Sequence, residues 1–215
     1  MGKVKKEMLR RNYAFEVRAE QDEKHGAIIT GTPIVYESKT DLFDFFEVID
    51  RVALDHADLT DVRFLVNHDT SKIPLARSRR NNDNSTMQLS VDKDGMKIRV
   101  DLDIENNAEA RALYSAVQRG DISGMSFMFA VDSDTWDNLD SDKPTRHIRA
   151  ISTVVEVSAV TFPAYEDTEI QARDKKALEN ARNALDSGKR AKSVDTDAIE
   201  LERKRLENFF MEARR

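Results

Sequence analysis

Apolar and polar residues alternate with a period of two along much of this chain, which is the pattern of a half-buried β-strand. The first such stretch covers residues 12–18. The strongest signal is Asp94-Gly95 between two alternating runs, which predicts a hairpin over residues 85–103. The pattern also predicts strands at residues 27–36, 64–66, 73–78, 125–131 and 148–161.

A helical period stands out within this strand-rich region at residues 107–119. Asn107 can cap the start of this helix, and Gly120 can end it. Residues 48–54 fit a strand and a helix equally well, and the pattern leaves that choice open. The sequence therefore predicts an α+β fold that is mainly β.

The character of the sequence changes near residue 166. We predict a basic leader over residues 1–11 and one folded domain over residues 12–166. We predict a charged tail over residues 167–215, with helical segments at 168–185 and 195–215. The apolar stripe of the tail is narrow, which suits docking onto a partner or leaves the segment unfolded when alone.

Composition narrows the class of protein. A chain of 215 residues with 40% hydrophobic content suits one domain of average size plus an extension. The chain has no cysteine, which removes thiol catalysis, thiolate metal sites and disulfides. Its net charge of −6 gives no overall attraction to nucleic acid. Hydroxyl and carboxylate chemistry remain.

The hydropathy pattern gives no reason to expect a membrane protein. No stretch reaches the roughly 18 to 20 apolar residues that a membrane-spanning helix needs. The N-terminal residues are mostly charged and lack the apolar centre of a signal peptide. We therefore expect a soluble protein of the cytoplasm.

Three side chains on strand-like runs could act together in hydrolysis: His68, Ser126 and Glu156. A serine hydroxyl is a weak nucleophile at pH 7, so it needs an imidazole to take its proton and a third group to orient that imidazole. A serine protease is therefore the leading hypothesis. Ser123 is a rival nucleophile in the same loop, and Asp69 is a rival third member.

Glu156 lies within a run of valines, which predicts that its carboxylate is buried. Burying a carboxylate costs several kcal/mol unless a partner satisfies it. His68 would be the partner in a catalytic site. Arg146 or Arg149 would be the partner in a structural ion pair, and the sequence alone leaves both pairings open.

Three motifs carry a resemblance to a known family: Phe64-Leu-Val-Asn-His-Asp69, Gly120-Asp-Ile-Ser-Gly-Met-Ser-Phe127 and Val155-Glu-Val-Ser-Ala-Val-Thr-Phe-Pro-Ala-Tyr165. From residue 13 to residue 165 the chain resembles the prohead proteases of tailed bacteriophages of the HK97 type. That family is related in fold to assemblin, the maturation protease of herpesviruses. The resemblance implies an assemblin-like β-barrel or bent antiparallel sheet with surrounding helices.

The resemblance also assigns roles to the candidate residues. It implies that Ser126 is the nucleophile, His68 the base and Glu156 the third member, with no metal or organic cofactor. The implied substrates are the scaffolding segment of the major capsid protein and the protease itself. Cleavage would take place inside the assembling prohead, in the host cytoplasm.

Two further expectations concern partners. The charged tail could bind the capsid precursor and be removed by self-cleavage, and we expect neither a membrane nor nucleic acid as a main partner. The competing hypothesis is a non-catalytic assembly module that keeps the protease fold and binds capsid protein through the same tail. An esterase would need a small-molecule pocket, which the sequence does not reveal.

Overall fold

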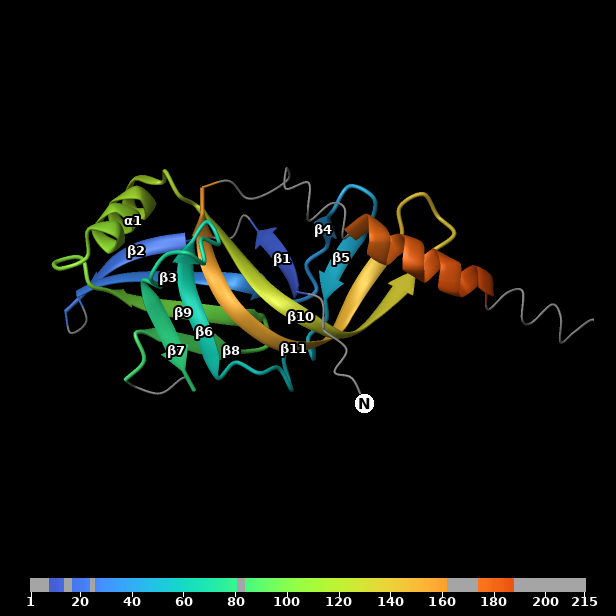
Figure 1. Cartoon of the computed structure of the whole chain (residues 1–215), viewed down its shortest axis with the longest axis horizontal. Coiled ribbons are helices and arrows are strands. Elements are labelled where there is room, and N and C mark those ends of the chain that lie inside the picture. The colour runs from blue at the N-terminus through green and yellow to red at the C-terminus, as the bar shows by residue number, and fades with distance from the viewer. Residues whose placement is uncertain (1–7, 14–16, 24–25, 81–83, 162–173, 188–215) are drawn as a thin grey trace, which may run out of the picture.

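A computed structural model describes residues 8–13, 17–23, 26–80, 84–161 and 174–187 of the chain. Within these residues the strands form two open sheets, one of seven strands and one of four, and no closed barrel. The prediction of an α+β fold that is mainly β is confirmed. Of the two predicted arrangements, the bent sheet is correct and the barrel is wrong, as Figure 1 shows.

The seven-stranded sheet carries the candidate residues. Its main path runs β1-β10-β11-β5-β4, while β6 pairs with both β11 and β7. The strands are β1 (Met8–Tyr13), β4 (Thr40–Asp41), β5 (Phe46–Ile49), β6 (Asp61–Val66), β7 (Ala76–Arg79), β10 (Gly124–Asp137) and β11 (Thr145–Val160).

The two longest strands, β10 and β11, pair in antiparallel register through the middle of this sheet and curve along the molecule (Figure 1). On β10, Met125, Phe127 and Phe129 alternate with Ser126 and Met128, as the sequence predicts. The rings of Phe127 and Phe129 stack with centroids 4.8 Å apart, and both are fully buried. Burial of such side chains stabilises the fold by about 1.5–3 kcal/mol each.

The seven-stranded sheet is mixed, which departs from the antiparallel arrangement expected. Both β5 and β6 pair with β11 in parallel. A parallel pair needs a long connection between its strands, and here the paired residues lie 93 positions apart for β6 and β11 and 99 positions apart for β5 and β11. The pattern of apolar and polar residues within a strand does not indicate which distant strand it pairs with.

The four-stranded sheet has the order β2-β3-β9-β8. It contains the predicted hairpin, and Gly95 opens the strand that follows the turn. Its φ angle is 147°, and a Cβ atom at this position would lie 1.9 Å from the carbonyl oxygen of Ile34. Glycine is therefore required here. The strands are β2 (Val17–Asp22), β3 (Gly26–Val35), β8 (Met87–Val91) and β9 (Gly95–Leu102).

Two of the predicted strands differ in the structure, and the structure decides the segment that the pattern left open. Residues 12–18 are divided between β1 and β2, which belong to different sheets, because alternation indicates a buried face but not the sheet that buries it. The strand predicted at 73–78 is β7, and Ile73 before it is 85% exposed. The segment left open at 48–54 is strand only at its start, because β5 ends at Ile49 and residues 51–54 form turns.

The predicted helix is confirmed as α1 (Ala108–Arg119), which packs against β2, β3 and β9. The Asn107 side chain accepts hydrogen bonds from the main-chain N–H groups of Glu109 and Ala110, at 3.0 and 3.2 Å. Gly120 ends the helix with a left-handed φ of 80°. These two local signals set the point at which the chain enters β10.

Residues 174–187 form a second helix beside the end of the sheet that holds β4 and β5 (Figure 1). Leu178 is buried, and the Arg182 guanidinium donates to the carbonyl oxygen of Ser141 at 3.0 Å. This helix falls within the segment predicted to be helical at 168–185, whereas the one predicted at 195–215 lies outside the described residues. Neither of the described helices is long and apolar enough to cross a membrane.

Candidate active site

The turn after β6 carries His68. Asn67 and His68 both adopt positive φ angles, 51° and 57°, in the left-handed region that side chains other than glycine and asparagine seldom occupy. The turn is held against β11, because the Asn67 N–H donates to the Ala159 carbonyl and the Asn67 Oδ1 accepts from the Thr161 N–H, both at 2.9 Å. The two strained residues thus lie at the end of β11.

Strand β11 presents Glu156 and Ser158 on one face, because residues two apart on a strand point the same way. The Nδ1 atom of His68 is hydrogen-bonded to Oε1 of Glu156. Glu156 is 2% exposed, so the predicted burial is correct and His68 is one of its partners. Arg146 and Arg149 pair instead with other carboxylates, those of Asp134 and Glu47 and that of Asp50 respectively.

Ser158 joins these two side chains, and sequence reasoning did not single it out. Its hydroxyl donates to Oε2 of Glu156 at 2.7 Å and accepts from the main-chain N–H of His68 at 3.1 Å. We call His68, Glu156 and Ser158 the His68 cluster. The available signal was the Glu156-Val-Ser158 spacing, which places two polar side chains on one face of a buried strand.

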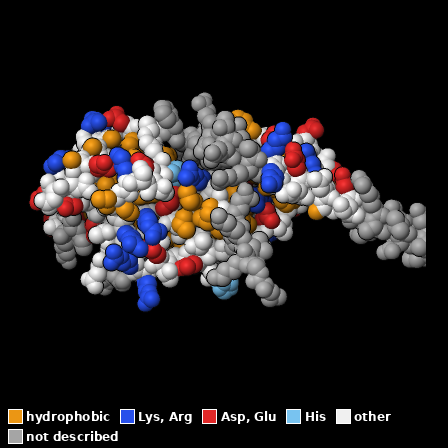
Figure 2. All heavy atoms as spheres, in the orientation of Figure 1, with side chains coloured by type: hydrophobic (Ala, Val, Ile, Leu, Met, Phe, Trp, Pro, Cys, Tyr) orange, Lys and Arg blue, Asp and Glu red, His pale blue; other side chains and the backbone are white. Residues whose placement is uncertain are grey.

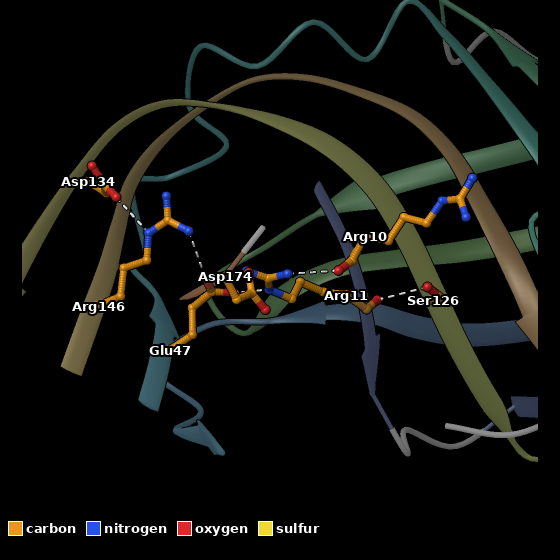
Figure 3. Close-up of polar contacts among 7 residues, drawn as sticks. All are labelled: Arg10, Arg11, Glu47, Ser126, Asp134, Arg146 and Asp174. Atoms are coloured by element: carbon orange, nitrogen blue, oxygen red, sulfur yellow. Dashed lines mark hydrogen bonds and ion pairs between the residues drawn. The ribbon is translucent and has the colours of Figure 1, made fainter. Parts of the chain in front are cut away.

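Strand β10 places Ser126 beside this cluster. Ser126 lies directly opposite Ser158 in the β10-β11 pairing, and side chains of opposite residues share a face at Cβ separations of about 4.5–5.5 Å. Ser126 is fully buried. Its hydroxyl donates to the carbonyl oxygen of Arg11 on β1 at 3.0 Å (Figure 3). The structure therefore brings all three predicted residues to one face, with the Ser126 hydroxyl turned toward β1.

The rival residues occupy other environments. Ser123 is exposed in the segment before β10. Asp69 accepts hydrogen bonds from the Ser71 side chain and main-chain N–H, and these bonds hold the pKa of Asp69 below its usual value. His147 contacts Asp50 and Asp137, and His56 is exposed. His25 lies outside the described residues.

A second buried polar group lies on the opposite face of the sheet. Arg11 is opposite Phe127, so its side chain points away from the face of Ser126. The Arg11 guanidinium binds both oxygens of Glu47 and donates to Oδ1 of Asp174 at 2.9 Å (Figure 3). Arg146 approaches the same Glu47 at 3.4 Å. We call Arg11, Glu47, Arg146 and Asp174 the Arg11 cluster.

Burial and charge act in opposite directions on the two carboxyls of the Arg11 cluster. Burial by itself would raise the pKa of Glu47, but the Arg11 and Arg146 guanidiniums outweigh it, so the pKa lies below its usual value. For Asp174 burial dominates and the pKa is raised, despite the pairing with Arg11. The Arg11 cluster therefore ties β1, β5 and β11 to the helix of residues 174–187.

A pocket of about 320 Å³ opens next to the His68 cluster. Glu156 and Met128 line it together with residues of β6 and of the segment after it. Figure 2 shows apolar side chains at the surface over β10 and β11, with Lys and Arg side chains gathered beside them over β6 and β7. The full lining is Arg63, Leu65, Thr70, Lys72, Pro74, Met128, Val155 and Glu156.

Comparison with known proteins gives the family. No curated protein matches the sequence. Among solved structures, the capsid assembly protease of bacteriophage T4 is similar, with 11% identity over 72% of this chain and 97% of that one and a TM-score of 0.41. The sequence matches the caudovirus prohead serine proteases over residues 13–183, which is most of its length. The chain therefore belongs to the caudovirus prohead serine protease family and is a serine protease.

Proposed function

We propose that Ser126 is the nucleophile of this protease, that His68 is its general base and that Glu156 orients His68. The observation that carries the proposal is the hydrogen bond between His68 Nδ1 and Glu156 Oε1 on the face of the sheet that also holds Ser126. A carboxylate on Nδ1 selects the tautomer in which Nε2 can take a proton. Family membership supports the same assignment.

The proposed reaction is acyl transfer in two steps. The Ser126 oxygen attacks the carbonyl carbon of the scissile peptide while His68 takes the hydroxyl proton, and His68 then gives that proton to the departing amine. Water next attacks the acyl-enzyme with His68 again acting as base, which releases the acid product and restores the Ser126 hydroxyl. Main-chain N–H groups near Ser126 would stabilise the oxyanion.

One movement must precede the first step. The Ser126 hydroxyl donates to the Arg11 carbonyl in this structure, so it must rotate toward His68 to hand over its proton. Catalytic hydrogen bonds are often misaligned before substrate binds and tighten in the complex. We therefore assign the present arrangement to the resting enzyme.

The pocket beside Glu156 is the proposed binding site for a side chain of the substrate. It is lined by apolar side chains from β6, β10 and β11, and Arg63 and Lys72 also line it. Lys72 Nζ lies 3.0 Å from Glu109 Oε1 on α1, and this pairing orients the Lys72 side chain in the wall of the pocket. An extended segment of polypeptide could therefore lie along this face with one side chain in the pocket.

The proposed substrates are the scaffolding segment of the major capsid protein and the protease itself, cleaved within the assembling prohead in the host cytoplasm. The catalytic domain would comprise residues 12–166, and the tail over residues 167–215 would recruit the enzyme to the capsid precursor and be removed by self-cleavage. A chain shortened to end near residue 165 tests recruitment. Packaging of that chain into proheads as efficiently as the full chain would contradict it.

The test of the proposed function is co-expression of the chain with its major capsid protein, with Ser126→Ala in parallel and intact masses read by mass spectrometry. We expect shortening of the capsid protein, and of the protease, only with the Ser126 hydroxyl present. Equal masses in both samples, with shells assembled in both, would favour the assembly-module hypothesis. Ser123→Ala is the matched control and should cleave normally.

A further inference from the structure

Ser158 is the least accessible polar side chain next to the proposed catalytic residues. It lies on β11, is fully buried, and faces Ser126 across the β10-β11 pair. Both hydrogen bonds of its hydroxyl go to residues of the proposed triad, one to the Glu156 carboxylate and one from the His68 main chain. Ser152, a partly buried serine on the same strand, donates instead to the main-chain carbonyl of Ala130.

The bond to Glu156 fixes the carboxylate about its last rotatable bond. Terminal carboxylate torsions are broad, so a single contact leaves the plane of the group poorly defined. Here Oε1 faces His68 and Oε2 accepts from Ser158 at 2.7 Å, so each oxygen has its own partner. Because the two oxygens are held separately, the oxygen offered to the imidazole keeps its direction.

The bond from His68 fixes the backbone that carries the imidazole. The φ angle of His68 is 57°, a conformation that persists only where surrounding groups hold it. The Ser158 oxygen accepts the His68 N–H at 3.1 Å, and Asn67 is held from Ala159 and Thr161. The hydroxyl of Ser158 thus holds both the carboxylate of Glu156 and the main chain of His68.

We infer that Ser158 is a positioning residue of this protease, which acts through Glu156 and His68 on the nucleophile opposite it. The inference rests on the proposed function, since it assigns Ser158 to the triad of Ser126, His68 and Glu156. Small displacements of positioned groups can lower rates about 10²-fold. Loss of the Ser158 hydroxyl should therefore slow the chemical step and leave the fold and substrate binding largely intact.

The experiment measures the rate at which a fluorophosphonate probe labels Ser126 in the full chain. The Ser126 oxygen bonds to phosphorus, fluoride leaves, and His68 takes the hydroxyl proton, so the rate depends on activation of the serine but not on a natural substrate. Labelling is compared in the wild type, Ser158→Ala, Ser158→Thr and Ser152→Ala. Ser152 is the matched control because it lies on β11 and donates to the Ala130 carbonyl at 3.1 Å.

We expect Ser158→Ala to lower the maximal labelling rate about 10- to 100-fold with little change in the probe concentration that gives half that rate. Ser158→Thr keeps the hydroxyl and should recover most of the rate, and Ser152→Ala should label as the wild type does. Equal thermal midpoints for Ser158→Ala and Ser152→Ala would separate positioning from loss of fold.

A second measurement does not depend on activity. In a Ser126→Ala background, nitrogen-15 NMR of the histidines should show His68 protonated on Nδ1 and hydrogen-bonded, with His68→Gln identifying the signal. Ser158→Ala should shift or broaden that signal, and Ser152→Ala should not. This reading also holds if the threonine variant folds poorly.

The outcomes separate the two claims. A wild-type rate and an unchanged His68 signal in Ser158→Ala would overturn the positioning role and leave the proposed triad standing. Absence of label on Ser126 in the wild type, or equal labelling of His68→Gln, would overturn the triad and the role of Ser158 with it.

Discussion

Two buried polar clusters lie on opposite faces of the seven-stranded sheet and meet near one point of the chain. The His68 cluster lies on the face of Ser126, and the Arg11 cluster lies on the face of Phe127. They are linked because the Arg11 carbonyl accepts the Ser126 hydroxyl while the Arg11 side chain binds Glu47 and Asp174 (Figure 3). The same sheet thus buries charged side chains in two different ways, one on each face.

The clusters differ in the kind of charge they bury. Arg11 and Arg146 carry guanidiniums that do not lose their protons at any ordinary pH, and they face the carboxylates of Glu47 and Asp174. The His68 cluster contains an imidazole, the side chain whose ordinary pKa lies nearest neutrality. Fixed charges can hold elements together, whereas proton transfer requires a group that can change its charge. The comparison predicts that changes to one cluster mainly affect stability and changes to the other mainly affect rate.

The largest expected effect is on rate, in the His68 cluster. Glu156→Gln should slow cleavage and labelling of Ser126 about 10³- to 10⁴-fold, because an amide no longer selects the imidazole tautomer or stabilises its charged form. The measurement is the single-turnover rate with purified protein. Asp92→Asn removes a partly exposed carboxylate that is paired with Lys97 of the four-stranded sheet, away from the site, and is the control. A Glu156→Gln variant that cleaves within tenfold of the wild type would contradict the comparison.

The next largest effect is on stability, in the Arg11 cluster. Arg11→Ala leaves Glu47 and Asp174 without their shared cation, and removing one partner of a buried ion pair costs about 3–5 kcal/mol. The measurement is urea unfolding, read as a lower midpoint at constant slope.

Arg10→Ala is the matched control for that experiment. Arg10 is the neighbour of Arg11 on β1, it is partly exposed, and its side chain points away from the cluster (Figure 3). The control should unfold within about 1 kcal/mol of the wild type, as is usual for partly exposed side chains. Similar midpoints for the two alanine variants would show that the Arg11 cluster does not hold the fold together.

The two carboxyls of the Arg11 cluster should respond to pH with opposite signs. The pKa of Asp174 is raised, so its contribution to stability is complete below its unfolded value of 3.8 and is lost as pH rises through the raised pKa. The pKa of Glu47 is lowered, so its contribution is present above its unfolded value of 4.5 and is lost as pH falls through the lowered pKa.

Urea midpoints measured between about pH 3 and pH 7 check these signs, with each group contributing at most about 1.4 kcal/mol per pH unit. Relative to the wild type, Asp174→Asn should gain stability as pH rises, and Glu47→Gln should lose it. If the stability of both variants, relative to the wild type, changed with pH in the same direction, the two carboxyls would not titrate with opposite signs.

The elements predicted correctly from the sequence are those set by neighbours in the chain. Asn107 and Gly120 bound α1, and Asp94-Gly95 forms the hairpin, because caps and tight turns are determined within a few residues. The parallel pairing of β6 with β11 and the separation of β1 from β2 depend on distant partners. Period-two alternation is the same for a strand in either sheet, so it could not assign them.

The candidate site shows the same division. His68, Ser126 and Glu156 could be named because each lies in a recognisable motif, and the burial of Glu156 followed from the valines around it. Arg11 was assigned to the leader, since its partners Glu47 and Asp174 lie 36 and 163 residues away. Ser158 lies in the motif of residues 155–165, but its two hydrogen bonds depend on how the turn at His68 folds back onto β11.

The smallest effect is expected at an ion pair that lies on the surface, which can be compared with the buried pair of Arg11 and Glu47. Arg77 on β7 binds Asp61 on β6 through two hydrogen bonds, as Arg11 binds Glu47, but the side chains are 38% and 39% exposed. The pairing lowers the pKa of Asp61, yet exposed pairs contribute only about 0–1 kcal/mol because water and salt screen them. Arg77→Ala should therefore shift the urea midpoint slightly, by less at high salt, and leave Ser126 labelling unchanged. A loss as large as that of Arg11→Ala would mean that the number of hydrogen bonds, and not burial, separates the two sites. A loss of labelling would mean that the position of β6, and with it His68, depends on this surface pair.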